Sequence, residues 1–119
     1  MKRSGQIAML RFPQTDLNEG KLRPALLLAA LPGNYGDWLV CMLSTKLHQA
    51  IGGFDETIGK DAADFDSSGL RVPSVIRVGR LAVVSREVLA GFVGEVSAER
   101  LRRIRENLLL WIKGGSLPV

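Results

Sequence analysis

Two kinds of side chain that can bind a phosphodiester stand beside two apolar segments of this sequence. Arg23 comes just before the run ALLLAA, and Ser44 and Thr45 directly follow the run DWLVCML. If the two runs are neighbouring antiparallel strands, Arg23 and Ser44 lie at the same end of a sheet. A permanently charged guanidinium beside hydroxyl donors is suited to holding a phosphate. The alternative is that Arg23 pairs with an acidic neighbour while the hydroxyl residues merely end a strand.

Other groups near these positions could take part in binding a nucleic acid. Lys21 and Lys46 flank the expected site and would attract a phosphate backbone. Because the unperturbed pKa of histidine is near neutrality, His48 could act as a general acid or base, or it could be a loop histidine with no role. Rings on which an unstacked base could lie are present at Tyr35, Trp38 and Phe54. Because Trp38 begins an apolar run, we expect it in the core.

Composition narrows the classes of function. The 119 residues carry a formal net charge of +4, and much of the acidic charge is concentrated between positions 55 and 66, so the remainder is clearly basic. There is one histidine and no HExxH, CxxC, Walker or GxSxG motif, so we expect no metal and no cofactor. The lone Cys41 lies among apolar residues, which suggests a small core side chain. No apolar run approaches the ~18 residues of a membrane span. We therefore expect a cytoplasmic protein that is not associated with a membrane.

The hydropathy pattern predicts one domain, residues 1–119, with strands first and a helix last. Strands are expected at GQIAMLRF, ALLLAA, DWLVCML, SVIRV and RLAVV, with a short sixth at FDETI. SVIRV and RLAVV are joined at Gly79, where a bulge or bend is expected. An acidic surface loop is expected at about 55–72, and a helix at about 97–113 with Ser97 as its N-cap.

Several stretches together resemble one known family. GQIAMLRFPQTD, GKLRPALLLA, DWLVCMLSTK, SVIRVGRLAVV and GEVSAERLRRIRENL occur in the order found in the PemK/MazF toxin endoribonucleases of type II toxin–antitoxin systems. The resemblance covers nearly the whole chain. Its specific part is a Gly-hydrophobic strand ending in Phe-Pro, then Arg-Pro before an apolar strand, then a strand that ends in Ser or Thr.

The resemblance implies an SH3-like β-barrel of about five to seven largely antiparallel strands with a C-terminal helix. It also implies a homodimer, a cognate antitoxin, and metal-free cleavage of single-stranded RNA. The family's catalytic arginine and hydroxyl correspond to Arg23 and Ser44, with Thr45 next to the latter. Many members have a glutamate where Asn18 stands, and Glu19 is one step away; some have a histidine where Leu22 stands.

Such cleavage can use the 2'-hydroxyl of the RNA as the nucleophile. Arginine is a poor base because its pKa exceeds 12, so Glu19, Asp16 and His48 are the residues to consider for removing the proton. Two other functions are open at this point. One is a non-catalytic barrel that binds nucleic acid or a protein, and the other is a toxin that acts on a protein such as a topoisomerase.

Overall fold

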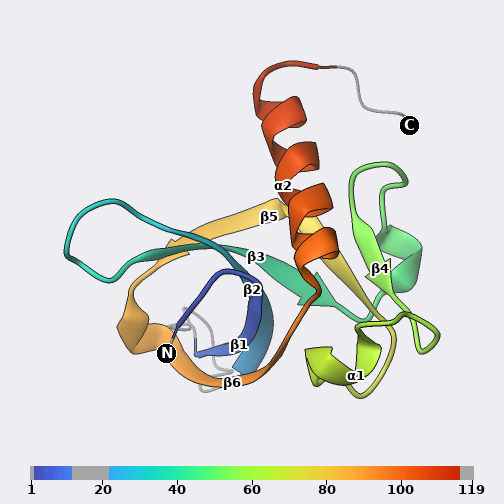
Figure 1. The fold of residues 1–119 in the computed structure, drawn as a ribbon, viewed down its shortest axis with the longest axis horizontal. Helices are drawn as coiled ribbons and strands as arrows, with labels where there is room; N and C mark the ends of the chain where they lie inside the picture. The colour runs from blue at the N-terminus through green and yellow to red at the C-terminus, as the bar shows by residue number, and fades with distance from the viewer. Residues whose placement is uncertain (1, 12–21, 116–119) are drawn as a thin grey trace, which may run out of the picture.

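The computed structural model describes residues 2–11 and 22–115, which form a curled sheet with one long helix packed against it (Figure 1). The elements in chain order are β1 (Gln6–Arg11), β2 (Leu22–Ala30), β3 (Trp38–Ser44), η1 (Leu47–Gln49), β4 (Glu56–Ile58), α1 (Phe65–Ser68), β5 (Ser74–Val84), η2 (Arg86–Val88), β6 (Leu89–Glu95) and α2 (Ala98–Ile112).

The sheet of the described residues has six strands in the order β4-β5-β3-β2-β1-β6, and each neighbouring pair is antiparallel. The ladder of strands is not closed, because β4 and β6 form its two edges. α1, which follows β4, packs against the other edge, where the Ser67 hydroxyl donates a hydrogen bond to the Glu95 carbonyl at 3.2 Å. This approach requires Gly94, since a Cβ there would lie 2.2 Å from the Ser67 carbonyl oxygen. The mainly β, barrel-like class predicted from the sequence is confirmed.

Apolar side chains alternate along the strands and pack on both faces of the sheet. One face is covered by α2, whose Leu101, Ile104 and Leu108 join the main core. The strand residues of this main core are Ile7, Leu26, Leu28, Cys41, Leu43, Ile58, Ile76 and Val78. The opposite face carries a second core made of Ala8, Leu10, Ala25, Leu27, Trp38, Val40 and Val84. Because the period of a strand is two residues, β2 and β3 contribute to both cores.

The helix α2 begins where the apolar period changes from two residues to a helical spacing. The Ser97 side chain caps it by accepting a hydrogen bond from the Arg100 amide at 3.1 Å, as its position predicts. Arg105 attaches the helix to β2, because its Nε and Nη2 both donate to the Leu28 carbonyl, at 3.2 and 2.7 Å. Near the C-terminal end, Trp111 packs edge-on against Phe54, with ring centroids 5.5 Å apart.

Two strand predictions differ from the structure. The segments SVIRV and RLAVV form a single strand, β5, with an irregularity around Gly79 rather than a break. The segment 89–95 forms β6, which the sequence analysis did not predict. Gly91 and Gly94 weaken the strand signal of this segment, and its pairing with β1 has two register shifts.

The stretch 55–72, expected as an acidic surface loop, also contributes to the interior. It contains β4 and α1, and the Asp64 side chain is buried. Arg100 of α2 holds Asp64 through Nε to Oδ2 at 2.8 Å and Nη2 to Oδ1 at 3.1 Å, and Glu56 through Nη1 at 2.8 Å. Lys60, Asp61 and Asp66 are exposed. Part of the acidic charge is therefore paired with Arg100 inside the fold and does not lie on the surface.

Candidate active site

The pairing of β2 with β3 brings Arg23 and Ser44 to the same end of the sheet. Ala25 lies opposite Met42 in this antiparallel pair. The same register, continued along both strands, sets Arg23 opposite Ser44. Both residues line a cleft with a volume of about 380 Å³ and an adjoining one of about 390 Å³. The structure thus brings together the two groups whose positions first suggested an anion site.

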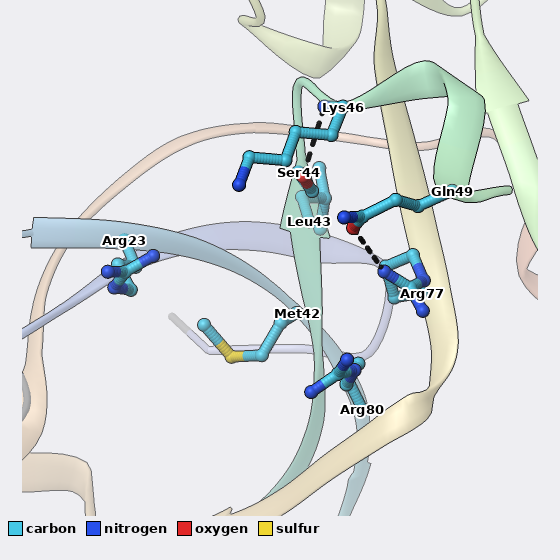
Figure 2. Close-up of a pocket in the computed structure, with 8 residues that line it drawn as sticks. All are labelled: Arg23, Met42, Leu43, Ser44, Lys46, Gln49, Arg77 and Arg80. Atoms are coloured by element: carbon cyan, nitrogen blue, oxygen red, sulfur yellow. Dashed lines mark hydrogen bonds between the residues drawn. The ribbon is translucent and has the colours of Figure 1, made fainter.

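Positive charge surrounds this cleft (Figure 2). The first cavity is lined by Arg23, Met42, Leu43, Ser44, Lys46, Gln49, Arg77 and Arg80. The adjoining cavity shares Arg23, Leu43, Ser44 and Lys46 and adds Leu22, Pro24, Thr45 and Ser74. Among the described residues, no carboxylate lines either cavity, while four cationic side chains line the first. Such a surface attracts phosphate groups and repels other cations.

The Arg23 guanidinium has no charged partner in the described part of the chain. Its side chain is exposed, and within residues 2–11 and 22–115 it has no ion pair or side-chain hydrogen bond. The alternative in which Arg23 pairs with an acidic neighbour therefore has no support in the described part of the chain. Pro24 restricts the backbone of the preceding residue to an extended form, which steadies the point where the arginine side chain leaves the strand.

The Ser44 hydroxyl is held by the turn that follows β3. Its Oγ accepts a hydrogen bond from the Lys46 amide at 3.0 Å. This contact uses the oxygen as an acceptor and leaves the hydroxyl hydrogen available for a ligand. Thr45 is exposed and borders the second cavity, so a second hydroxyl lies beside the first. Lys46 extends over the cleft in Figure 2 and adds an ammonium group.

Arg77 and Arg80 were not among the residues singled out from the sequence. They are three residues apart on β5, a spacing that would place them on opposite faces of a regular strand. The pairing of β5 with β3 jumps between Cys41, opposite Leu81, and Met42, opposite Arg77. Residues 78–80 are therefore extra on the β5 side, and both arginines line one cavity. The expected bulge at Gly79 was the signal that could have revealed them.

The structure does not bring all the predicted binding residues to the cleft. Tyr35 is 81% exposed on the β2–β3 connection, at the opposite end of these strands from Ser44. His48 is exposed on η1 and does not line either cavity. Phe54 is buried in the main core and Trp38, as expected, in the second core, so neither ring is available for stacking. The proposed roles of Asp16, Glu19 and Lys21 lie outside the described residues.

Cys41 has the structural role expected from its apolar neighbours. It is fully buried in the main core, and burial raises the pKa of its thiol to about 12, with a further contribution from the negative charge of Asp55. A thiol with such a pKa is a poor nucleophile at neutral pH.

Within residues 2–11 and 22–115, no group of three or more His, Cys, Asp or Glu side chains is arranged to hold a metal ion. In the same part of the chain, none of the helices combines the length and the apolar character needed to cross a bilayer.

Comparison with known proteins shows which family the chain belongs to. A family model described as "PemK-like, MazF-like toxin of type II toxin-antitoxin system" matches residues 3–112. The chain belongs to this family. Because the toxins of the PemK/MazF family are endoribonucleases, membership makes this chain a toxin of the endoribonuclease class. No curated protein matches the sequence.

Solved structures share the fold of this PemK/MazF-like toxin. A chain from "Endoribonuclease in complex with its cognate antitoxin from Mycobacterial species" has a TM-score of 0.65 at 17% identity, covering 99% of this chain and 100% of that one. The Mycobacterium tuberculosis toxin MazF-mt6 has a TM-score of 0.63 at 19% identity, with 96% and 99% covered. MazF from Deinococcus radiodurans has a TM-score of 0.64 at 25% identity, with 95% and 96% covered.

Proposed function

We propose that this toxin cleaves single-stranded RNA without a metal ion, using the 2'-hydroxyl of the RNA as the nucleophile. The observation that carries the proposal is the shared cleft, where the Ser44 hydroxyl and an Arg23 guanidinium with no partner among the described residues line the same cavity with three further cations. A phosphodiester in this cleft would meet a charged fork on one side and hydroxyl donors on the other.

In the proposed mechanism, Arg23 stabilises the negative charge that develops on the phosphate oxygens during attack. A fixed donor aimed at developing charge contributes about 3–4 kcal/mol in a site that excludes water. Ser44 donates its free hydroxyl hydrogen to a non-bridging oxygen, and Thr45 supports it from the adjoining cavity. These contacts hold the phosphate so that the 2'-oxygen, phosphorus and leaving 5'-oxygen are in line.

The general base is the part of the mechanism that the described residues do not supply. His48 lies outside both cavities. Glu19 remains our proposal for the base, with Asp16 as the alternative, and both belong to the segment before β2 that lies outside the described residues. A carboxylate entering the cleft there would meet the cations that line it, which would favour its ionised, proton-accepting form.

We also propose that the toxin works in the cytoplasm as a homodimer and is neutralised by a cognate antitoxin. The solved structure of a similar endoribonuclease in complex with its cognate antitoxin supports the proposal of an antitoxin partner. An antitoxin segment that covers the cleft would place acidic side chains on the cations and so compete with RNA. Exposed apolar residues at the end of α2, Leu109, Leu110, Trp111 and Ile112, support a protein partner for this helix.

The test is cleavage of end-labelled single-stranded RNA by the purified chain in EDTA. We expect discrete products with 2',3'-cyclic phosphate and 5'-hydroxyl ends, because attack by the 2'-oxygen closes the ring on phosphorus. Arg23→Ala should lower kcat at least a hundredfold, and Ser44→Ala should lower it as well. Arg102→Ala, which removes an exposed arginine of α2 outside the cleft, should cut as the unaltered chain does.

Several outcomes would contradict the nuclease proposal. Cleavage that survives Arg23→Ala would mean that this guanidinium does not stabilise the transition state. Retention of RNA by the unaltered chain without any cutting would indicate the non-catalytic barrel instead.

A further inference from the structure

Two side chains, those of Asp55 and Gln49, hold the guanidinium of Arg77 in place. Its Nε lies 3.3 Å from Asp55 Oδ2. Its Nη1 donates to Gln49 Oε1 at 2.9 Å (Figure 2). Arg77 has only 15% of its side chain exposed, although it lines the cleft. Nη2 makes no hydrogen bond within the described residues, so its two N–H donors are unused there.

Asp55 is itself fixed in place. Only 1% of its side chain is exposed. Its Oδ1 accepts from the Val78 amide at 2.9 Å, and its Oδ2 accepts from the Ile51 amide at 3.0 Å. These two backbone contacts tie the carboxylate to β5 and to the segment before β4, so it cannot turn away from Arg77. A guanidinium braced in this way loses little conformational freedom when it binds an anion.

We propose that Arg77 binds an RNA phosphate next to the scissile one, and that Asp55 and Gln49 are positioning residues that hold its guanidinium for this purpose. The inference rests on the proposed function, because it takes the scissile phosphate to lie between Arg23 and Ser44. Arg77 comes from β5, which lies on the far side of β3 from β2. Two strand spacings, about 10 Å, separate the backbones of β2 and β5, which places Arg77 at a neighbouring phosphate.

A purely structural role for Arg77 would be to neutralise the buried Asp55. That role predicts an effect on folding and none on RNA affinity or on its salt dependence. Binding to a phosphate predicts the opposite pattern, because each phosphate contact releases counterions from the nucleic acid. The two roles can therefore be separated by measuring binding and stability on the same variants.

The experiment measures binding of a fluorescent, fully 2'-O-methylated single-stranded RNA, which cannot be cut, by anisotropy over a range of salt concentrations. Arg77→Gln should weaken binding about tenfold, as expected for loss of a charged hydrogen bond. The slope of log K against log salt should fall in magnitude by about 0.7, the value for one phosphate on a single strand. Arg102→Gln is the matched control, with the same loss of charge outside the cleft and no expected change in slope.

A second variant guards against misfolding of Arg77→Gln. Gln49 is exposed, so Gln49→Glu should fold, and it places a carboxylate beside Arg77 that competes with phosphate. We expect about tenfold weaker RNA binding with an unchanged urea midpoint. Ala98→Glu adds the same charge at an exposed position in the first turn of α2 and should bind as the unaltered chain does.

Cleavage kinetics separate this inference from the function on which it rests. With cleavable RNA, Arg77→Gln and Gln49→Glu should raise KM while kcat changes little, whereas Arg23→Ala should lower kcat. If Arg77→Gln and Gln49→Glu bind with the affinity and salt slope of their controls, the assignment of Arg77 is wrong even though Arg23→Ala abolishes cutting. If Arg23→Ala cuts normally but the Arg77 variants lose affinity and slope, the proposed mechanism fails and the phosphate contact of Arg77 stands.

Discussion

Replacing Arg100 with methionine should remove a large part of the stability of this protein. The guanidinium is almost buried and is shared between Asp64 and Glu56. Methionine keeps an apolar stem of similar reach, so the packing of α2 is largely retained while both carboxylates lose this cation. Glu56 still pairs with Arg103 at 3.0 Å. Among the described residues, Asp64 keeps only the Ser97 amide, at 3.0 Å, as a donor from outside its own loop.

The expected cost is about 3–5 kcal/mol, the usual penalty for removing one partner of a buried ion pair. A domain of this size has a total stability of about 5–15 kcal/mol, so Arg100→Met should shift the unfolding midpoint strongly. The assay is urea unfolding at pH 7, followed by tryptophan fluorescence. Arg102→Met is the matched control, because its ion pair with Glu106 is 61% exposed on both sides and should contribute less than about 1 kcal/mol.

The dependence of stability on pH tests the same ion pair, Asp64 with Arg100, in a second way. Burial raises the pKa of Asp64, but the hydrogen bonds from Arg100 and Ser97 and the charge of Arg100 outweigh it, so the pKa is lowered overall. The stabilisation is therefore present above the pKa of the unfolded chain, about 3.9, and is lost as the pH falls through the lower pKa of the folded state. In Arg100→Met the carboxylate should protonate at higher pH, so the difference between variant and unaltered chain should narrow toward about pH 3.

A loss below about 1 kcal/mol for Arg100→Met at pH 7 would refute this reasoning. So would a difference from the unaltered chain that stays constant as the pH is lowered. Either result would mean that Asp64 finds other donors or water once the guanidinium is removed.

Two further outcomes follow from the packing. Cys41 should resist iodoacetamide at pH 8 in the folded protein and react at the rate of a free thiol in urea, as measured by mass spectrometry, since its pKa of about 12 leaves almost no thiolate; rapid labelling without urea would contradict its burial. Gly94→Ala should lower the free energy of unfolding by about 1–3 kcal/mol because its Cβ would lie 2.2 Å from the Ser67 carbonyl oxygen, whereas Gly91→Ala meets nothing within 4 Å and serves as the control.

The hairpin that positions the site could be predicted from sequence because its signals are local. ALLLAA and DWLVCML are short apolar runs joined by a turn rich in Pro, Gly and Asn, and the structure pairs them as antiparallel neighbours. Once that pairing is fixed, the shared end of Arg23 and Ser44 follows from geometry alone. The helix was predictable for a similar reason, since its apolar period and its Ser97 cap are contained in one segment.

The features that were missed depend on contacts between distant segments. Nothing near Asp64 in the sequence shows that its partner is Arg100 on another element, so its acidic stretch was interpreted as solvated. β6 is paired with β1 from the other end of the chain, and its two glycines obscure the alternation. Tyr35 was considered for the site because its ring could stack on a base, but β2 separates it from Arg23 and places it at the opposite end of the hairpin.

The irregular pairing within β5 also changes which alternate residues of the strand face each hydrophobic layer. Ile76, before the extra residues 78–80, and Val78, the first of them, point into the layer beneath the helix. After them, Leu81 still packs against that layer, while Ala82 and Val84 point into the other. The alternation of inward and outward positions is thus reset midway along the strand. Segment length between Val78 and Leu81 therefore matters as much as residue type, because it sets the phase of every side chain that follows.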